Sequence, residues 1–179
     1  MKLTKQDKIQ ILENALAYLV AFGMIIYGAG KVIQFDGALS NHKVVAQLSG
    51  MELMWAFYSY SKAYVIVLGV LEIGAALLIL FIKTRLIGGL IASTILINII
   101  LQDIFYHVNT GALRAAILYQ SSIFLIFYIH KNTVKKCLNV LTIDIKIYSN
   151  KEIWMIKVLL SVLVFVIFRI LEFYLTTKF

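Results

Sequence analysis

Five long apolar runs dominate this sequence of 179 residues. A helix rises about 1.5 Å per residue, so roughly 20 mostly apolar residues cross the hydrocarbon of a bilayer, which is about 30 Å thick. Runs near that length lie at residues 12–33, 63–82, 86–105, 115–130 and 153–175, and the fourth extends through Leu113 or tilts less than its neighbours. No proline interrupts them, and none shows the alternation typical of a strand. They predict five transmembrane helices.

Composition agrees with this interpretation. Hydrophobic residues make up 61% of the chain and charged residues 15%, whereas soluble domains average about 45–50% and about 25%. A single cysteine and the lack of low-complexity tracts exclude a disulfide-stapled module, collagen and disorder. The fold class predicted is therefore an all-α integral membrane protein.

Basic residues predict the orientation, because lysine and arginine resist translocation. Most lie at residues 2–8, 83–85 and 131–151, which fall on one side of the membrane if all five runs cross it. The N-terminus is thus expected in the cytoplasm and the C-terminus in the periplasm, in a bacterial inner membrane. The first run is too long for a signal peptide and lacks a cleavage site, so we expect it to be retained.

The net charge of +8 follows from this topology, so no nucleic acid is expected as a partner. Membrane lipids are expected partners, because the basic segment at residues 131–151 can touch anionic headgroups. Cys137 lies in that segment and is expected to be an inert thiol.

The connections predict the arrangement of the helices. Short links after the second and third runs, at 83–85 and about 106–114, require antiparallel neighbours. We therefore expect an antiparallel four-helix domain at residues 1–130, a basic cytoplasmic connector at 131–152 and an additional transmembrane helix at 153–179, packed outside the bundle.

Two connecting segments are harder to interpret. The long first connection, 34–62, is rich in aromatic residues and predicts a short amphipathic helix around 43–48, followed by an aromatic cluster at the outer interface. The stretch 138–148 fits a strand, a short helix or irregular structure equally well. Small residues predict where the helices pack closely: Ala17, Ala21, Gly28, Gly30, Gly69, Gly74, Ala75, Ala76, Gly88, Gly89 and Ala92.

Polar groups inside the runs are costly in lipid and are therefore functional candidates. With alternating helix directions, these groups fall in the outer half of the bilayer: Tyr27, Lys31, Glu72, Asn98, Gln102, Asp103, His107 and Gln120. We expect them to converge on a polar pocket; the alternative is a set of unrelated packing contacts. Glu72 is the deepest and must find Lys31, Tyr27 or an amide, or stay protonated.

Three further charges are expected to have structural or surface roles. Arg169 and Glu172 are three residues apart in the fifth run and can pair on one helix face. Glu13, near the inner end of the first run, is expected to be a surface charge.

The order of several short motifs resembles the DoxX family of small four-helix membrane proteins, over about residues 12–130. The motifs are Gly28-Ala29-Gly30-Lys31, a Gly-x-x-Glu stretch from Gly69 to Glu72 continuing to Gly74, the turn Thr84-Arg85-Leu86, and His107. Ala75 departs from the pattern, since the family often has glycine there. The resemblance implies a membrane subunit of an oxidoreductase system, such as a thiosulfate:quinone oxidoreductase; more distant relatives resemble receptor-assembly chaperones.

The residues themselves carry no redox chemistry that we can identify. The chain has no Cys-x-x-Cys motif, and His107 and His130 lie at opposite membrane sides, so neither thiol exchange nor haem is expected. His107 with Asp103 supplies only two ligands, so no metal is expected. Transport is disfavoured because there are no inverted repeats or proline-broken helices.

Two functions therefore remain. One is a subunit of a larger membrane complex, with another membrane protein as partner and with an outer-leaflet pocket for a quinone or lipid. The other is a non-catalytic structural or assembly subunit, in which the polar residues serve only helix packing. The sequence leaves open whether the chain is an enzyme.

Overall fold

The computed structural model describes residues 3–36, 44–142 and 151–177, and in these ranges it contains helices and no strands. Five helices are long and apolar enough to cross a membrane: α1 (Lys5–Gln34), α3 (Lys62–Leu80), α4 (Arg85–Tyr106), α5 (Thr110–Ile129) and α7 (Lys151–Thr177). This composition is compatible with a multi-pass membrane protein, as the five runs predicted. Two helices of eleven residues, α2 (Gly50–Tyr60) and α6 (Lys131–Leu141), are too short to span.

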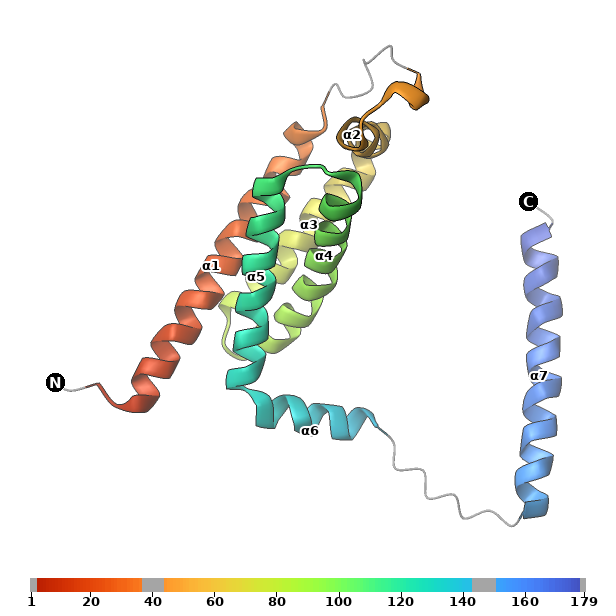
Figure 1. Ribbon diagram of the computed structural model, residues 1–179. Helices are drawn as coiled ribbons and strands as arrows, with labels where there is room; N and C mark the ends of the chain where they lie inside the picture. The colour runs from red at the N-terminus through yellow and green to blue at the C-terminus, as the bar shows by residue number, and fades with distance from the viewer. Residues whose placement is uncertain (1–2, 37–43, 143–150, 178–179) are drawn as a thin grey trace. The chain divides into compact units, whose positions relative to one another are not determined.

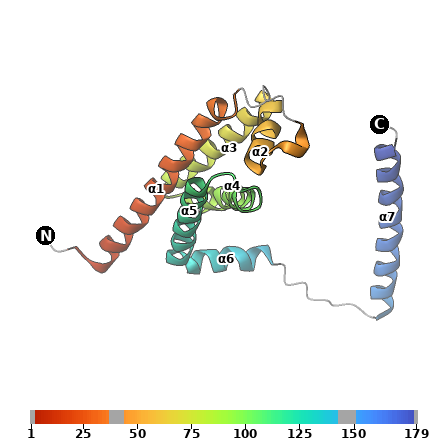
Figure 2. The ribbon, with the colours of Figure 1, turned by 45° about the horizontal axis from the view of Figure 1, so that its top comes forward.

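Four helices form an antiparallel bundle in which each packs against two neighbours (Figures 1 and 2). The order around the bundle is α1, α3, α4, α5 and back to α1. Alanines are frequent in the core, so the backbones approach closely, which stabilises association where lipid gives no hydrophobic driving force. The core consists of Ala17, Val20, Ala21, Met24, Ala75, Ala76, Ile79, Ala92, Leu96, Ala116, Ile123 and Ile126.

Most of the predicted small residues lie at these contacts, but two do not. A Cβ atom built on Gly28 would lie 2.9 Å from the carbonyl oxygen of Gly69, so α1 and α3 touch backbone to backbone. Around Gly30 and Gly74, by contrast, no atom lies within 4 Å of such a Cβ. The prediction that these two glycines form packing contacts is therefore wrong.

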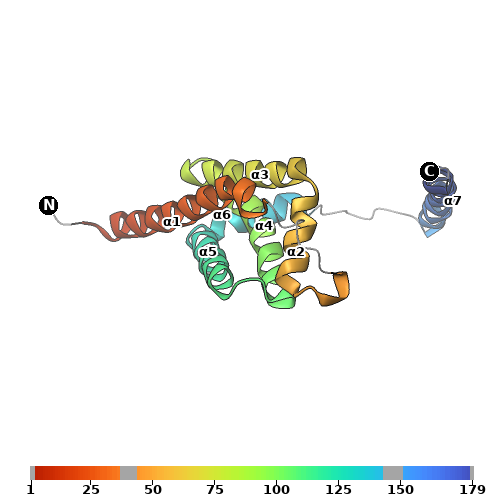
Figure 3. The same cartoon turned by 90° about the horizontal axis from the view of Figure 1, so that it is seen from above.

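The helix α2 lies across the ends of α3 and α4, at the end of the bundle that we call the α2 end (Figure 3). A capping box fixes its start. The Ser49 hydroxyl accepts a hydrogen bond from the backbone N–H of Glu52, and the Glu52 carboxylate accepts one from the backbone N–H of Ser49. The sequence predicted a helix at 43–48 instead. Only a 3-10 turn, Val45–Gln47, is found there, and part of the predicted range lies outside the described residues.

The helix α5 begins earlier than the sequence predicted. Asn109 caps it by accepting from the backbone N–H groups of Gly111 and Ala112, so the link from α4 is residues 107–109 and the helix has 20 residues. The fourth span is thus of ordinary length. At the other end of α5 the chain turns at His130, and α6 follows as a helix through Leu141; residues 143–148 of the stretch 138–148 lie outside the described residues.

The chain divides into two compact units, Met1–Lys136 and Cys137–Phe179. The second contains α7, a helix of 27 residues in which Arg169 and Glu172 form the predicted ion pair. The packing of α7 outside the bundle stays a prediction.

Candidate functional site

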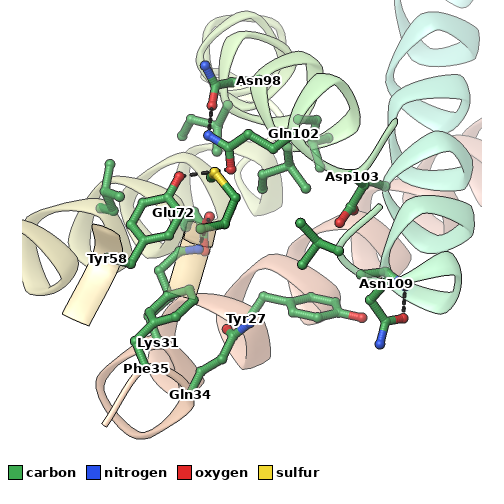
Figure 4. A pocket seen from close by; sticks show the side chains of 18 of the residues that line it. Tyr27, Lys31, Gln34, Phe35, Tyr58, Glu72, Asn98, Gln102, Asp103 and Asn109 are labelled. Carbon is green, nitrogen blue, oxygen red and sulfur yellow. Dashed lines mark hydrogen bonds and ion pairs between the residues drawn. The ribbon is translucent and has the colours of Figure 1, made fainter. Parts of the chain in front are cut away.

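A cavity of about 750 Å³ opens at the α2 end, among α1, α2, α3, α4 and the first turns of α5 (Figure 4). Cavities of this size commonly hold small ligands. Its wall is apolar at Met24, Leu68, Ile95 and Ile99, among others. Its polar and aromatic lining residues are Tyr27, Lys31, Gln34, Phe35, Trp55, Tyr58, Tyr64, Glu72, Thr94, Asn98, Gln102, Asp103, Asn109 and Tyr119.

An ion pair between α1 and α3 forms one wall. The ammonium of Lys31 lies 3.1 Å from Oε1 of Glu72, and these side chains are only 12% and 3% exposed. Lys31 follows Gly28 by three residues and Glu72 follows Gly69 by three. Because α1 and α3 are antiparallel, the two residues flank the close backbone contact from opposite sides, and their side chains, which lean toward the N-terminus of each helix, meet across it. The glycines therefore bring the two charges together, and Glu72 finds one of the partners that its depth required.

Aromatic rings from the C-cap of α1, from α2 and from α3 line the cavity. Phe35, which is 6% exposed, stacks on Tyr58 with ring centroids 4.8 Å apart and meets Trp55 edge to face at 5.9 Å. Tyr58 in turn stacks on Tyr64 at 6.1 Å. The Lys31 ammonium lies 6.0 Å from the centroid of the Phe35 ring, within the range of a cation–π contact.

A row of amides on α4 ties α2 to the bundle. The Gln102 amide donates to Oδ1 of Asn98 at 2.5 Å, and the Tyr58 hydroxyl donates to Oε1 of Gln102 at 2.8 Å. Burial raises the pKa of Tyr58 above its ordinary value. These bonds hold α2 in place, and the labelled side chains can be followed in Figure 4.

Asp103 faces the cavity from the last turn of α4 (Figure 4). It is 7% exposed, and its carboxylate accepts a hydrogen bond from the backbone N–H of Asn109, in the link to α5. Its other oxygen, Oδ2, has no hydrogen-bond partner among the described residues, and the same holds for Oε2 of Glu72 and Nε1 of Trp55. Buried polar atoms are rarely left in this state, so these three can bind a ligand.

Six of the eight predicted site residues thus line the cavity, and two do not. His107 is exposed and ends α4 in the left-handed conformation, with φ of 51°. Gln120 is buried between helices and donates to the Ser93 hydroxyl at 3.0 Å. Neither residue lines the cavity, and spacing along the sequence does not reveal this.

The prediction that Glu13 is a surface charge is wrong. It is 7% exposed, and its Oε1 receives the Arg85 guanidinium at 2.5 Å and Nε2 of His130 at 3.0 Å. Arg85 also donates from Nε to the carbonyl of Ile79 at 3.0 Å, near the end of α3. We call Glu13, Arg85 and His130 the Glu13 cluster; it lies at the end of the bundle opposite the cavity, where α4 begins and α5 ends.

The sequence held signals for the residues that were missed. In an antiparallel bundle the first turns of α1 and α4 and the last turn of α5 share one end, so Glu13, Arg85 and His130 could have been expected to meet. Asn109 lies six residues before the fourth run and is a preferred N-cap residue. Tyr58 gave no such signal, because its role depends on how α2 folds over the bundle.

Comparison with known proteins shows similarity to a bacterial protein. The chain is 31% identical over 101 residues, which is 55% of its length, to the uncharacterized protein YwoB of Bacillus subtilis (strain 168). The matched segment spans 65% of that relative. No family model matches the chain, so the resemblance to the DoxX family stays a prediction. No solved structure matches it either.

Proposed function

We propose that this chain is a membrane protein whose four-helix bundle binds a small amphiphile, such as a quinone or a lipid, in the cavity at the α2 end. The observation that carries the proposal is the combination of an ion pair, aromatic rings and unpartnered polar atoms around one cavity of about 750 Å³. A bundle stabilised only by packing has no need to bury a lysine and two carboxylates beside open space.

The two kinds of lining suit an amphiphile. Glu72 lies ten residues after the start of α3, so the polar wall is about 15 Å deep along that helix. The polar group of the ligand contacts this wall, while its apolar part contacts Met24, Leu68, Ile95 and Ile99. Such a molecule reaches the cavity from the lipid phase.

The chain is best interpreted as one subunit of a larger membrane complex, in a redox-linked system of the bacterial inner membrane. The groups that can take up or release a proton at the cavity are Glu72, Asp103 and Lys31. No group of three or more His, Cys, Asp or Glu residues within the described ranges could hold a metal ion.

Purification in a mild detergent tests the proposal. We expect the full chain to retain a quinone or a lipid in a fixed ratio, identified by mass spectrometry of the extracted protein. Glu72→Gln keeps the shape of the side chain and Glu72→Leu does not, and both should lower retention. Glu172→Gln, an acid-to-amide change in α7, is the matched control and should retain the ligand. Equal retention by all four proteins would contradict the proposal.

The alternative is a structural or assembly subunit, and α7 favours it. Considered alone, α7 is a helix of 27 residues with long apolar stretches, which suits docking against another membrane protein. In that case Glu72→Gln leaves the complex intact, Glu72→Leu blocks assembly, and no small molecule is retained.

We also propose that the α2 end faces the periplasm and that α6 lies on the cytoplasmic leaflet. On α6 the apolar Val134, Leu138 and Leu141 share one face, and Lys135 and Lys136 lie on the other, as in helices that bind the surface of anionic membranes. An impermeant maleimide tests this in intact cells. It should label a cysteine introduced by Asp36→Cys and should spare the native Cys137; the reverse pattern would invert the topology.

A further inference from the structure

The formal charges on the cavity wall do not balance. Among the described residues that line it there are two carboxylates, Glu72 and Asp103, and one cation, Lys31. Lys31 is already held by Oε1 of Glu72. Asp103 has only the backbone N–H of Asn109. In a medium of low dielectric constant, a buried carboxyl either stays protonated or is ionised with a cation beside it.

The unpartnered atoms specify where that cation would bind. Oδ2 of Asp103 and Oε2 of Glu72 have no hydrogen-bond donor among the described residues, and both side chains are more than nine-tenths buried. An ionised carboxylate only accepts hydrogen bonds, so both oxygens need a ligand that donates. Figure 4 shows the Asp103 carboxylate directed into the cavity.

We propose that the ligand carries an ammonium group, which donates hydrogen bonds to Asp103 and to Oε2 of Glu72 while its apolar part fills the cavity. This inference rests on the proposed function, since it specifies the ligand of the same cavity. The aromatic rings support it, because ring faces attract organic cations and the Phe35 ring already lies near the Lys31 ammonium.

Other amphiphiles match the hydrogen-bonding needs and the charge of these carboxylates less well. The carbonyl oxygens of a quinone only accept hydrogen bonds, so they leave both oxygens unpartnered as long as the carboxylates are ionised. A fatty acid places a third carboxylate beside Asp103 and Glu72, where like charges repel. An alcohol donates one hydrogen bond but leaves the negative charge uncompensated. The ammonium alone matches both the hydrogen bonds and the charge.

Tryptophan fluorescence can test the inference in the full chain. The sequence has two tryptophans, Trp55 at the cavity and Trp154 in α7, so Trp154→Phe leaves Trp55 as the reporter. This protein, in a non-ionic detergent, is titrated with dodecylammonium, dodecanol, dodecanoate and a decyl-substituted benzoquinone. Dodecylammonium should bind at least about tenfold more tightly than the other three, as expected for a desolvated cation.

Asp103→Asn in the same background is the decisive variant, because it keeps the shape and removes the charge. It should abolish the preference for dodecylammonium over dodecanol while dodecanol still binds, which shows that the cavity has folded. Glu172→Gln is the matched control and should keep the preference. A preference unchanged in Asp103→Asn would overturn the inference.

The remaining outcomes separate the two proposals. If dodecanol or the benzoquinone binds saturably and dodecylammonium binds no more tightly, the ammonium inference is wrong and the proposed function stands. If no compound binds saturably, both are wrong. A short-chain phosphatidylethanolamine added to the series distinguishes the source: binding as tight as that of dodecylammonium indicates a lipid headgroup, and weaker binding indicates a free amine.

Discussion

Both ends of the bundle bury a carboxylate against a cation from another helix, but only one end leaves charged groups unmatched. In the Glu13 cluster one carboxylate receives both Arg85 and His130. At the cavity, Glu72 receives Lys31 alone, and Oδ2 of Asp103 receives no donor among the described residues. A buried charge is therefore a poor indicator of a binding site by itself, whereas unmatched buried groups beside open space are a better one.

Arg85→Leu should produce the largest loss of stability, because it breaks the matched end. It leaves the Glu13 carboxylate buried with His130 alone, and removing one partner of a buried ion pair costs about 3–5 kcal/mol. The measurement is unfolding of the purified protein in mixed detergent micelles. Retention of the amphiphile by the folded fraction should not change.

The double variant Glu13→Leu with Arg85→Leu is the control for this prediction. It removes both charges, so it should be more stable than Arg85→Leu alone. If Arg85→Leu instead keeps its stability and loses the ligand, the Glu13 cluster is part of the functional site and the contrast between the two ends is wrong.

Gly69→Ala should produce the next largest loss of stability, and the packing that it disturbs lies at the cavity end of the bundle. Its new methyl group would lie 2.5 Å from the carbonyl oxygen of Gly28, so α1 and α3 must separate and Lys31 must move away from Glu72. Overpacking of this kind costs about 1–3 kcal/mol, and ligand retention should fall as well. Unfolding and mass spectrometry measure the two effects.

Gly74→Ala is the matched control on the same helix. No atom lies within 4 Å of its new methyl group, so it should be neutral or should stabilise α3 by up to about 1 kcal/mol through helix propensity. If the two alanine variants behave alike, the close contact of α1 with α3 does not position the ion pair.

Tyr58→Phe should cost less, about 1 kcal/mol, because it removes only the hydrogen bond to Gln102. The difference in the free energy of unfolding between the wild type and this variant should depend on pH. Burial raises the pKa of Tyr58 above its ordinary value of 10.0, so the unfolded chain loses this proton first. The stabilisation by neutral Tyr58 is complete below pH 10 and is lost as the pH rises through the folded-state pKa. Unfolding measured from pH 8 to 11 tests this, and a stability difference that stays constant over that range would contradict the raised pKa of Tyr58.

His107→Gly should have the smallest effect, with the opposite sign. His107 has φ of 51°, a left-handed conformation that costs an L-residue free energy and costs glycine almost none, so the variant should be about 1 kcal/mol more stable. Thermal unfolding measures this. Because His107 does not line the cavity, retention should be unchanged; loss of the ligand would restore His107 to the site, as the sequence predicted.

The sequence by itself determined the five long helices and how far along each one its polar groups lie. Run length decides which segments can span, and the direction of each helix decides that Lys31, Glu72 and Asp103 lie toward one end of the bundle. The position of Glu72 in its run predicted that it needs Lys31, Tyr27 or an amide as a partner or stays protonated, and the structure selects Lys31.

Only the tertiary structure decided which polar groups meet. In a membrane bundle the lipid-facing and core-facing sides of a helix are both apolar, so periodicity does not reveal how the helix is rotated about its axis. Rotation buries Gln120 against Ser93 and leaves His107 exposed. The rotation of α1 and α4 also brings Glu13 and Arg85 into an ion pair. The contribution of α2 to the cavity wall depends on contacts with α3 and α4 far along the chain, and no local pattern encodes those contacts.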